Sequence, residues 1–347
     1  MKTRRFLSLV PIALVGLICG SQAEVSTEAA TSSKCDRYAA PSGVDSGRGT
    51  LNRPYATPKK LVAALAPGQT GCLRGGTYSF STLVLNEASL TLAPYRSEEV
   101  ELRGEIKVRP DGAGSVIEGM KLNAVGDLGP RIYANSVVLR DNEITNNNTA
   151  ICVLVGRYYS QPAPRGVVIK RNRIHHCGRL PATNHHHGIY LGEARNTIVR
   201  DNWIYMNADR GIQQYPAVQA SLITGNVIDS NGQGVNFGGD DSGSCSNNNT
   251  VEGNVITNSN VRWNAYSGAQ GPDCSGNVVR RNCVFASNVE SDYNSNGGIE
   301  PNSRSFNASG NLVATPSFVD PSSGDYRLRS DSACLSHYEG TNTPPGP

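Results

Sequence analysis

Short runs of alternating hydrophobic and polar residues recur along most of the chain. The octet Val-Val-Leu-Arg-Asp-Asn-Glu-Ile at 137–144 returns in related form at 167–174, 197–204, 221–228, 249–256 and 277–284. The shared asparagines lie 24 to 30 residues apart and are Asn142, Asn172, Asn202, Asn226, Asn254, Asn282 and Asn311. Self-similarity at such a spacing indicates a repeat architecture, in which each repeat forms one structural unit.

A second phrase, a small residue followed by an aliphatic one, recurs between the octets. Its copies are Ala150-Ile151, Gly188-Ile189, Gly211-Ile212, Gly234-Val235 and Gly298-Ile299. Each repeat therefore holds at least two short strands. A helical solenoid is excluded because β-branched residues stand at alternate positions, Gly and Asn are abundant, and no apolar stripe of helical length is present.

The pattern predicts an all-β solenoid. Each strand would pair in parallel with the same strand of the next coil, so that Val, Ile and Leu stack inward while their neighbours form outward columns. The asparagine column has a structural explanation, since asparagine tolerates the left-handed backbone conformation and its amide can hydrogen-bond the amide stacked above it.

The repeat, its Asn-x-Ile phrase and its Gly-Ile strands resemble the single-stranded right-handed parallel β-helix proteins of the pectate-lyase-like superfamily, over about residues 35–335. The opening segment 37–47, followed by Pro54-Tyr-Ala-Thr and Leu73-Arg-Gly-Gly-Thr-Tyr, is similar to the start of many secreted members. The resemblance implies the fold, and it favours the polysaccharide lyases and uronate epimerases of that superfamily, which act on acidic glycans.

The chain reads as one exported domain. Residues 1–23 form a predicted signal peptide, with three basic residues, an apolar run at 6–18 and a small-residue cleavage site at 21–23. That run is too short to span a bilayer, and no other segment is long and apolar enough. Residues 24–347 are then a single domain, divided into an N-terminal cap and first coil at 35–80, coils at 81–335, and a Pro/Gly-rich tail at 341–347 that we expect to be disordered.

Both ends of the solenoid need protection, because a terminal coil exposes unpaired strand edges. Residues 57–66 predict a short amphipathic capping helix with Thr57 as N-cap and Pro58 at its first position. At the other end, 316–328 resembles the closing segment of many secreted β-helix proteins, and we expect Cys334 to secure it.

Cysteine content and charge limit the partners. Eight cysteines follow the predicted signal peptide, and coil geometry favours pairing of near neighbours; the predicted disulfides are Cys35–Cys72, Cys152–Cys177, Cys245–Cys274 and Cys283–Cys334. The formal charge of +3 disappears with the three basic residues of the signal. With no basic stripe and interleaved aromatics, nucleic acid is not an expected partner. We expect an extracellular monomer that is not bound to a membrane.

Candidate chemistry is concentrated in the central coils, because five of the six histidines fall between 175 and 187. Aligning the Gly-Ile phrases puts Arg210 at the place of His187 one coil on, with Gln213 beside Tyr190; Gln233 and Asn236 follow another coil later. Stacked strands lie about 4.8 Å apart, so His187, Tyr190 and Arg210 can meet around one reacting group. Tyr215 can lie on the same outward face.

This set suits β-elimination from a uronic acid sugar. Arg210 would pair with the carboxylate and His187 would remove the neighbouring proton, while Tyr190 or Tyr215 would protonate the leaving oxygen. His185, Gln213, Gln233 and Asn236 are the predicted substrate contacts. Further tyrosine or tryptophan side chains could offer stacking platforms for sugars, namely Tyr158, Tyr159, Tyr205, Trp263 and Tyr266. The sequence thus favours a secreted lyase acting on an acidic polysaccharide.

Other functions remain open from the sequence. A glycoside hydrolase needs two carboxylates across the scissile bond, and the available ones are Glu193, Asp209, Asp240, Asp241 and Glu300, which show no clear pairing. A uronate C5-epimerase would share the proton abstraction, and a non-catalytic glycan-binding or cell-surface protein would need none. The histidines could also be structural or bind zinc, although no convincing zinc ligand set is present. No cofactor is predicted; the pair Asp240-Asp241 is weak evidence for calcium.

Overall fold

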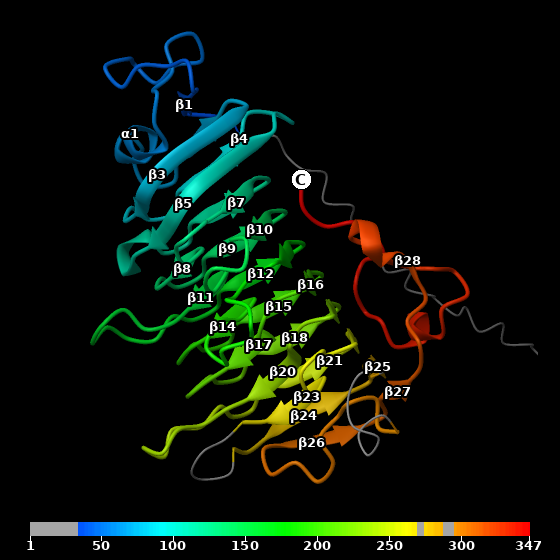
Figure 1. Ribbon diagram of the computed structural model, residues 1–347. Helices are drawn as coiled ribbons and strands as arrows, with labels where there is room; N and C mark the ends of the chain where they lie inside the picture. The colour runs from blue at the N-terminus through cyan, green and yellow to red at the C-terminus, as the bar shows by residue number, and fades with distance from the viewer. Residues whose placement is uncertain (1–33, 269–273, 287–294) are drawn as a thin grey trace, which may run out of the picture. The chain divides into compact units, whose positions relative to one another are not determined.

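The protein is a right-handed parallel β-solenoid of about nine turns with almost no helix (Figure 1). The computed structural model describes residues 34–268, 274–286 and 295–347, so the predicted signal peptide lies outside the described residues. Residues 34–347 form one compact unit. The single-stranded, all-β architecture predicted from the repeat is confirmed.

Two long parallel sheets build the coils, and a small antiparallel hairpin follows them. The first sheet contains, in spatial order, β1 (Arg37–Ala39), β2 (Thr70–Leu73), β4 (Thr91–Pro94), β6 (Val116–Glu118), β9 (Val138–Arg140), β12 (Val168–Lys170), β15 (Ile198–Arg200), β18 (Leu222–Thr224), β21 (Thr250–Glu252), β24 (Asn277–Arg280) and β26 (Phe306–Ser309). The hairpin is β28 (Phe318–Asp320) and β29 (Asp325–Leu328).

The second sheet has two rows that meet at the long strand β5 (Val100–Val108), which also pairs with β3 (Gly76–Leu85). One row is β7 (Lys121–Asn123), β10 (Glu143–Thr145), β13 (Arg173–His175), β16 (Trp203–Tyr205), β19 (Val227–Asp229), β22 (Val255–Thr257), β25 (Cys283–Phe285) and β27 (Leu312–Val313). The other row is β8 (Arg131–Ile132), β11 (Val153–Val155), β14 (Ile189–Leu191), β17 (Arg210–Gln214), β20 (Gln233–Phe237) and β23 (Ala265–Ser267).

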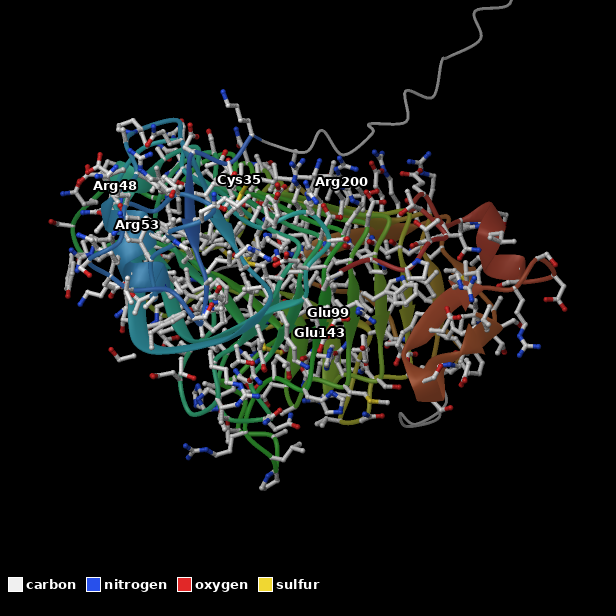
Figure 2. The ribbon with its side chains drawn as sticks, turned by 90° about the horizontal axis from the view of Figure 1, so that it is seen from above. Cys35, Arg48, Arg53, Glu99, Glu143 and Arg200 are labelled. Atoms are coloured by element: carbon white, nitrogen blue, oxygen red, sulfur yellow. A yellow bond between two sulfur atoms is a disulfide. The ribbon has the colours of Figure 1, made fainter. Side chains whose placement is uncertain are left out.

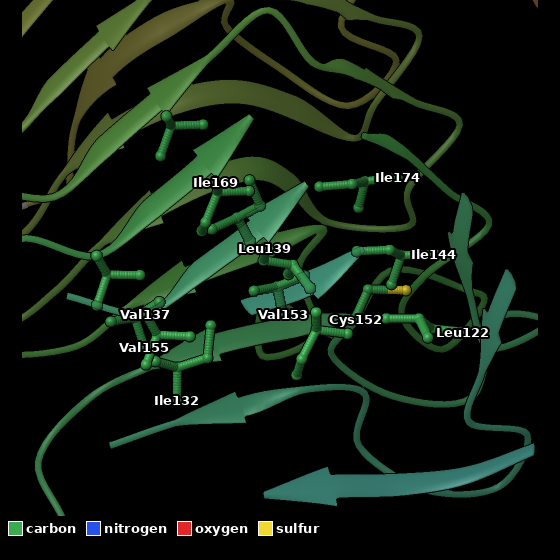
Figure 3. Close-up of a cluster of buried hydrophobic side chains, with 14 of the residues drawn as sticks. Leu122, Ile132, Val137, Leu139, Ile144, Cys152, Val153, Val155, Ile169 and Ile174 are labelled. Atoms are coloured by element: carbon green, nitrogen blue, oxygen red, sulfur yellow. The ribbon is translucent and has the colours of Figure 1, made fainter. Parts of the chain in front are cut away.

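Each octet therefore forms two strands separated by a corner, and the Gly-Ile phrase opens the third strand of the coil. The interior is filled by aliphatic side chains stacked coil on coil, as Leu139 and Ile169 are in the first sheet and Ile144 and Ile174 in the second (Figure 3). All four are fully buried. Burying one such side chain contributes about 1.5–3 kcal/mol, so the repeated column is the main source of stability.

Asparagine side chains turn the corner between the two strands of each octet. Asn202 Nδ2 donates to Asn226 Oδ1 at 2.9 Å, and the same oxygen accepts the Asn202 backbone N–H at 3.0 Å. Asn202 Nδ2 also donates to the carbonyls of Ile169 and Arg200. The ladder runs without a break from Asn142 to Asn311. The predicted stacking of amides is confirmed.

The predicted backbone role of these asparagines is wrong. The left-handed conformation belongs to the residue before each one, as at Asp141 (φ 57°), Asp201 (φ 57°) and Gly225 (φ 63°). The chain turns at that residue, and the asparagine side chain that follows points into the interior of the solenoid. Both of its donors can then converge on a single oxygen of the next coil.

A second amide column explains the small residues of the Gly-Ile phrase. A Cβ added at Gly188 would lie 2.9 Å from Asn207 Nδ2, and one added at Gly211 would lie 3.0 Å from Asn231 Nδ2. Ala150-Ile151 does not align with this phrase as predicted, because Val153 is the residue that pairs with Ile189. The strand starts later there because Ala150 lies in a turn that the Asn146 side chain closes through the Ala150 carbonyl.

The N-terminal end is capped as predicted. Helix α1 (Pro58–Ala63) follows Thr57, whose hydroxyl accepts the Lys60 N–H at 3.1 Å, and Leu61 and Val62 are buried against the first strands. The remaining helices are single 3₁₀ turns: η1 (Pro110–Gly112), η2 (Pro321–Ser323) and η3 (Ala333–Ser336).

The C-terminal segment packs against the side of the coils, where Figure 1 shows it in orange and red. Phe318, Tyr326 and Leu328 share a buried cluster with the outward side chains of β16, β19 and β22, which are Trp203, Val227 and Val255. Those positions continue the outward column of Lys121, Glu143 and Arg173, which is charged in the preceding coils. An apolar outward column must be covered, and the segment from β28 onward covers it.

The tail at 341–347 has a defined position, contrary to the predicted disorder. The Gly346 N–H donates to the Arg171 carbonyl at 3.1 Å, and Arg173 donates to the Pro347 carbonyl at 3.0 Å. The Thr341 N–H donates to Asp201 Oδ1 at 3.2 Å. The Arg171 carbonyl and the side chains of Arg173 and Asp201 thus hold a segment whose composition alone predicts no packing.

All four predicted disulfides are present, with Cα–Cα distances of 5.2 to 5.6 Å. Two outward-facing cations are neutralised locally, since Arg140 pairs with Glu118 at 2.5 Å and Arg200 with Asp201 at 2.6 Å. Arg200 is labelled among the outward-projecting side chains in Figure 2. No helix in the described part of the chain has the length and apolar character needed to cross a bilayer.

The amide ladder makes a direct prediction about stability. Asn202→Ala should lower the free energy of unfolding by about 3 kcal/mol, because it removes the acceptor of the buried Asn172 N–H and one of the donors to Asn226 Oδ1. Urea denaturation measures the change. The exposed Asn52→Ala serves as the control and should stay within about 0.5 kcal/mol. Equal effects of the two substitutions would show that the ladder contributes no stability.

Candidate active site

The predicted residues come together on the outward face of β14, β17, β20 and β23. Tyr190 pairs in register with Gln213, Gln213 with Asn236, and Asn236 with Tyr266. Beside this column, the pairing of Ile189 with Ile212 puts His187 next to Arg210, and Arg210 pairs with Gln233. The alignment made from the sequence is therefore confirmed for these coils.

Arg210 is the charged centre of the cluster, and its side chain is only 7% exposed. Its Nε donates a hydrogen bond to Tyr266 Oη, and its Nη1 donates to the Asn184 carbonyl at 3.2 Å. The guanidinium carbon also lies 5.5 Å from the centre of the Tyr266 ring. No carboxylate among the described residues forms an ion pair with Arg210, so a buried cation is left without a counter-ion.

His187 lies beside this cation and is 3% exposed. Its ring centre is 5.7 Å from that of Tyr190, and its Nδ1 accepts a long hydrogen bond of 3.5 Å from the Arg210 backbone N–H. Burial, and secondarily the Arg210 charge, holds the pKa of His187 well below its ordinary value. The imidazole is therefore neutral at neutral pH and can accept a proton.

Asp209 organises the loop that precedes His187. Its Oδ1 accepts the Asn184 N–H at 2.7 Å, and its Oδ2 accepts the N–H groups of His185 and His186 at 3.0 and 2.8 Å. The same contacts hold the Asn184 carbonyl against Arg210. The sequence offered Asp209 only as a possible hydrolase carboxylate, and nothing in the pattern indicated that it anchors this loop.

Two glutamines in the cluster have unused acceptors. The side-chain oxygens of Gln213 and Gln233 are buried and accept no hydrogen bond from the described residues. Asn236 is engaged, since its Oδ1 accepts the Gln214 N–H at 3.3 Å. Leaving a buried polar atom unpaired costs about 1–3 kcal/mol, so both side chains are held in an unfavourable state.

The two predicted catalytic tyrosines lie close together. Burial raises the pKa of Tyr190 to about 12, with smaller contributions from Tyr215 and Glu193. The Tyr190 ring lies over Gly192, where an added Cβ would be 3.3 Å from Tyr190 Cε1. The Tyr215 ring lies over Gly238, where the corresponding distance to Tyr215 Cδ2 is 2.8 Å. Each glycine thus gives a tyrosine ring room to lie flat on the sheet.

Two residues, His185 and Tyr266, lie in positions that the sequence did not predict. His185 is exposed, and its backbone N–H donates to Asp209 Oδ2. Tyr266, named from the sequence only as a possible sugar platform, contacts Arg210 directly. Its strand lacks the Gly-Ile phrase, so sequence alignment could not place it in this column.

Three of the other carboxylates suggested for a hydrolase, Glu193, Asp240 and Glu300, have structural partners. Glu193 pairs with Arg157 at 2.6 Å, and Glu300 accepts the Ser267 N–H at 2.6 Å. Asp240 accepts from the hydroxyl of Ser242, and that hydrogen bond is the main cause of its lowered pKa. No group of three or more His, Cys, Asp or Glu residues in the described ranges could hold a metal ion.

Comparison with known proteins agrees with the fold. A family model described as "Right handed beta helix region" matches residues 108–260. No curated protein matches the chain. Among solved structures, pectate lyase Pel9A is similar with a TM-score of 0.63 and 14% identity, over 87% of this chain and 91% of that one. A rhamnogalacturonan lyase is similar with a TM-score of 0.52 and 14% identity, over 82% and 90%.

At this level of identity the likeness shows the fold alone. The cluster around Arg210 is a feature of this chain's own residues. The coil, the family model and the similar structures agree with one another. The chain therefore folds as a right-handed parallel β-helix.

Proposed function

We propose that the protein is a secreted lyase that cleaves a uronic-acid-containing polysaccharide by β-elimination. The observation that carries the proposal is the buried Arg210, which has no carboxylate partner among the described residues and lies beside a neutral, buried His187. A buried guanidinium without a counter-ion is costly unless a ligand supplies the anion. A substrate carboxylate is the group that fits this need.

The proposed reaction follows from what each residue can do. In a uronate, the proton on the carbon next to the carboxylate is weakly acidic. Pairing the carboxylate with Arg210 stabilises the enolate-like charge that develops when this proton leaves. Arg210 Nε and one Nη1 hydrogen are already engaged, so the Nη1–Nη2 end is the side available for a bidentate pair. His187 is the base.

The unused glutamine oxygens extend the recognition from a carboxylate to a sugar. Gln233 pairs in register with Arg210, and Gln213 lies on the same strand as Arg210 in the adjacent column; the side-chain oxygen of each is a buried acceptor without a donor among the described residues. Sugar hydroxyl groups are donors that can satisfy them. A ligand that carries one carboxylate among several hydroxyls matches the cation and both acceptors together.

The similar structures support the class of reaction but not the assignment of residues. Two of them are named as a pectate lyase and a rhamnogalacturonan lyase. A C5-epimerase would use the same Arg210 and His187 for proton abstraction, so it is the closest alternative. A hydrolase is less favoured, because Glu193, Asp209, Asp240 and Glu300 are held in structural contacts.

We also propose where the protein acts and which partner it binds. Four disulfides are typical of an oxidising compartment, and the predicted signal peptide gives a route to it. We propose an extracellular monomer whose partner is an acidic polysaccharide, with no role for nucleic acid or membrane binding. Arg210 supplies the positive charge that the reaction needs, so calcium has no assigned role.

An elimination assay tests the proposal. The purified protein is incubated with alginate, polygalacturonate, glucuronan and hyaluronan, with added calcium or with EDTA, and the ultraviolet absorbance of the new C4=C5 double bond is followed. We expect it to grow with one class of glycan under both conditions. His187→Ala should lower the rate by about 10²–10⁴-fold.

The matched control is His176→Ala, which removes an exposed histidine on another row of the solenoid and should leave the rate unchanged. A saturated product with an inverted uronate would establish the epimerase instead. Binding without any product, unaffected by His187→Ala, would make the protein a glycan-binding module. New reducing ends without the double bond would make it a hydrolase.

The depressed pKa of His187 sets the expected pH dependence. The base acts only when unprotonated, and burial lowers its pKa well below 6.5, so kcat/KM should be level near neutrality and fall only in acid, as His187 takes up a proton. Tyr190, with its pKa raised to about 12, should cause no loss at moderately alkaline pH. A rate profile across this range checks both limits. An acid limb centred at or above 6.5 would remove His187 from the role of base.

A further inference from the structure

Tyr266 approaches Arg210 from a distant part of the chain. It belongs to β23, two strands beyond the β17 strand that carries Arg210 in the same row. Its side chain reaches back across β20, so that its hydroxyl oxygen accepts the Arg210 Nε–H. The ring is buried, and it packs against Trp263 at 5.3 Å between ring centres. Its position relative to Arg210 is therefore fixed on several sides.

The hydroxyl oxygen of Tyr266 accepts the Arg210 Nε–H. The Asn236 side chain also contacts this hydroxyl and lowers its pKa. The amide oxygen of Asn236 has a partner of its own, because it accepts the Gln214 N–H. A phenol has one proton to give. No acceptor among the described residues takes the proton of Tyr266.

We propose that Tyr266 is the general acid of the elimination, which hands its proton to the leaving oxygen of the glycan. This assignment rests on the proposed function and replaces Tyr190 and Tyr215 in that step. Arg210 lies between the two groups that would move protons: His187 stands one coil before it, and Tyr266 comes from two coils after it. A sugar held through its carboxylate at Arg210 is thereby flanked by a base and an acid.

The elimination moves two protons and breaks one C–O bond. His187 takes the proton from C5, and the electrons of that bond form the C4=C5 double bond. The C4–O bond breaks, and its oxygen takes the proton of Tyr266 as it leaves. The resulting phenolate is next to the Arg210 guanidinium and the Asn236 amide, which stabilise it. Proton exchange with water returns His187 and Tyr266 to their starting states.

Tyr190 and Tyr215 have a different position. Tyr190 lies on the same side as the base, with its ring 5.7 Å from that of His187. Burial raises the pKa of Tyr266 in spite of the opposing effect of Arg210, so its phenol stays protonated at neutral pH and can act as an acid. The flat rings of Tyr190 and Tyr215 are left to contact the sugar face.

The test compares two leaving groups on one enzyme. Tyr266→Phe keeps the ring and removes the proton. With the natural glycan, kcat should fall by at least about 100-fold, because the sugar alkoxide is a poor leaving group without protonation. With a uronate that carries a nitrophenyl ether at C4, the leaving phenolate needs no proton, and the variant should stay within about tenfold of the wild type. Tyr95→Phe, far from the site, is the matched control.

Several outcomes would overturn this assignment. Equal losses on both substrates would mean that Tyr266 only positions Arg210, and full activity on the glycan would remove it from the reaction. The fold is checked by thermal unfolding, and substrate affinity by comparing His187→Ala with and without Tyr266→Phe, which should agree within about threefold. Wild-type protein that eliminates neither substrate would refute the proposed function itself, whereas an active wild type with an unaffected variant refutes only the role of Tyr266.

Discussion

The ladder of buried asparagine amides is the constraint on which the rest of the structure depends. Each amide ties one coil to the next through two donors that converge on one oxygen, as Asn202 does with Asn226. That geometry fixes the register of the neighbouring strands, and a shift by one residue would turn the aliphatic columns outward. The outward columns inherit the same register. His187, Arg210 and Gln233 are adjacent because the corners of their coils are locked.

The candidate site uses this rigidity to hold groups that would otherwise be unfavourable. Arg210 is buried with a tyrosine and a backbone carbonyl as partners, and two glutamine oxygens beside it have no donor among the described residues. Charges and acceptors of this kind are tolerated only on a scaffold whose stability comes from elsewhere. Here it comes from the aliphatic interior and from the amide columns.

The regular part of the molecule could be predicted from the sequence because it repeats. Alignment of the octets predicted the strands and the asparagine ladder, alignment of the Gly-Ile phrases predicted the neighbours of His187, and pairing of near-neighbour cysteines predicted the four disulfides. The predictions that failed concern parts of the structure that depend on single tertiary contacts. Nothing local marks Asp209 as the anchor of the preceding loop, or brings Tyr266 back to Arg210. The tail at 341–347 is held by the Arg171 carbonyl and by the side chains of Arg173 and Asp201, which are distant in sequence.

Arg210 is proposed to bind the carboxylate of the substrate, and a binding measurement tests this role directly. The inactive His187→Ala protein would be titrated calorimetrically with a uronate oligosaccharide of the glycan that it cleaves, and with the same oligosaccharide after reduction of its carboxyl groups to alcohols. The account predicts at least about tenfold weaker binding of the reduced ligand, and loss of that difference when Arg210→Met is added. Equal affinity for the two ligands would contradict it.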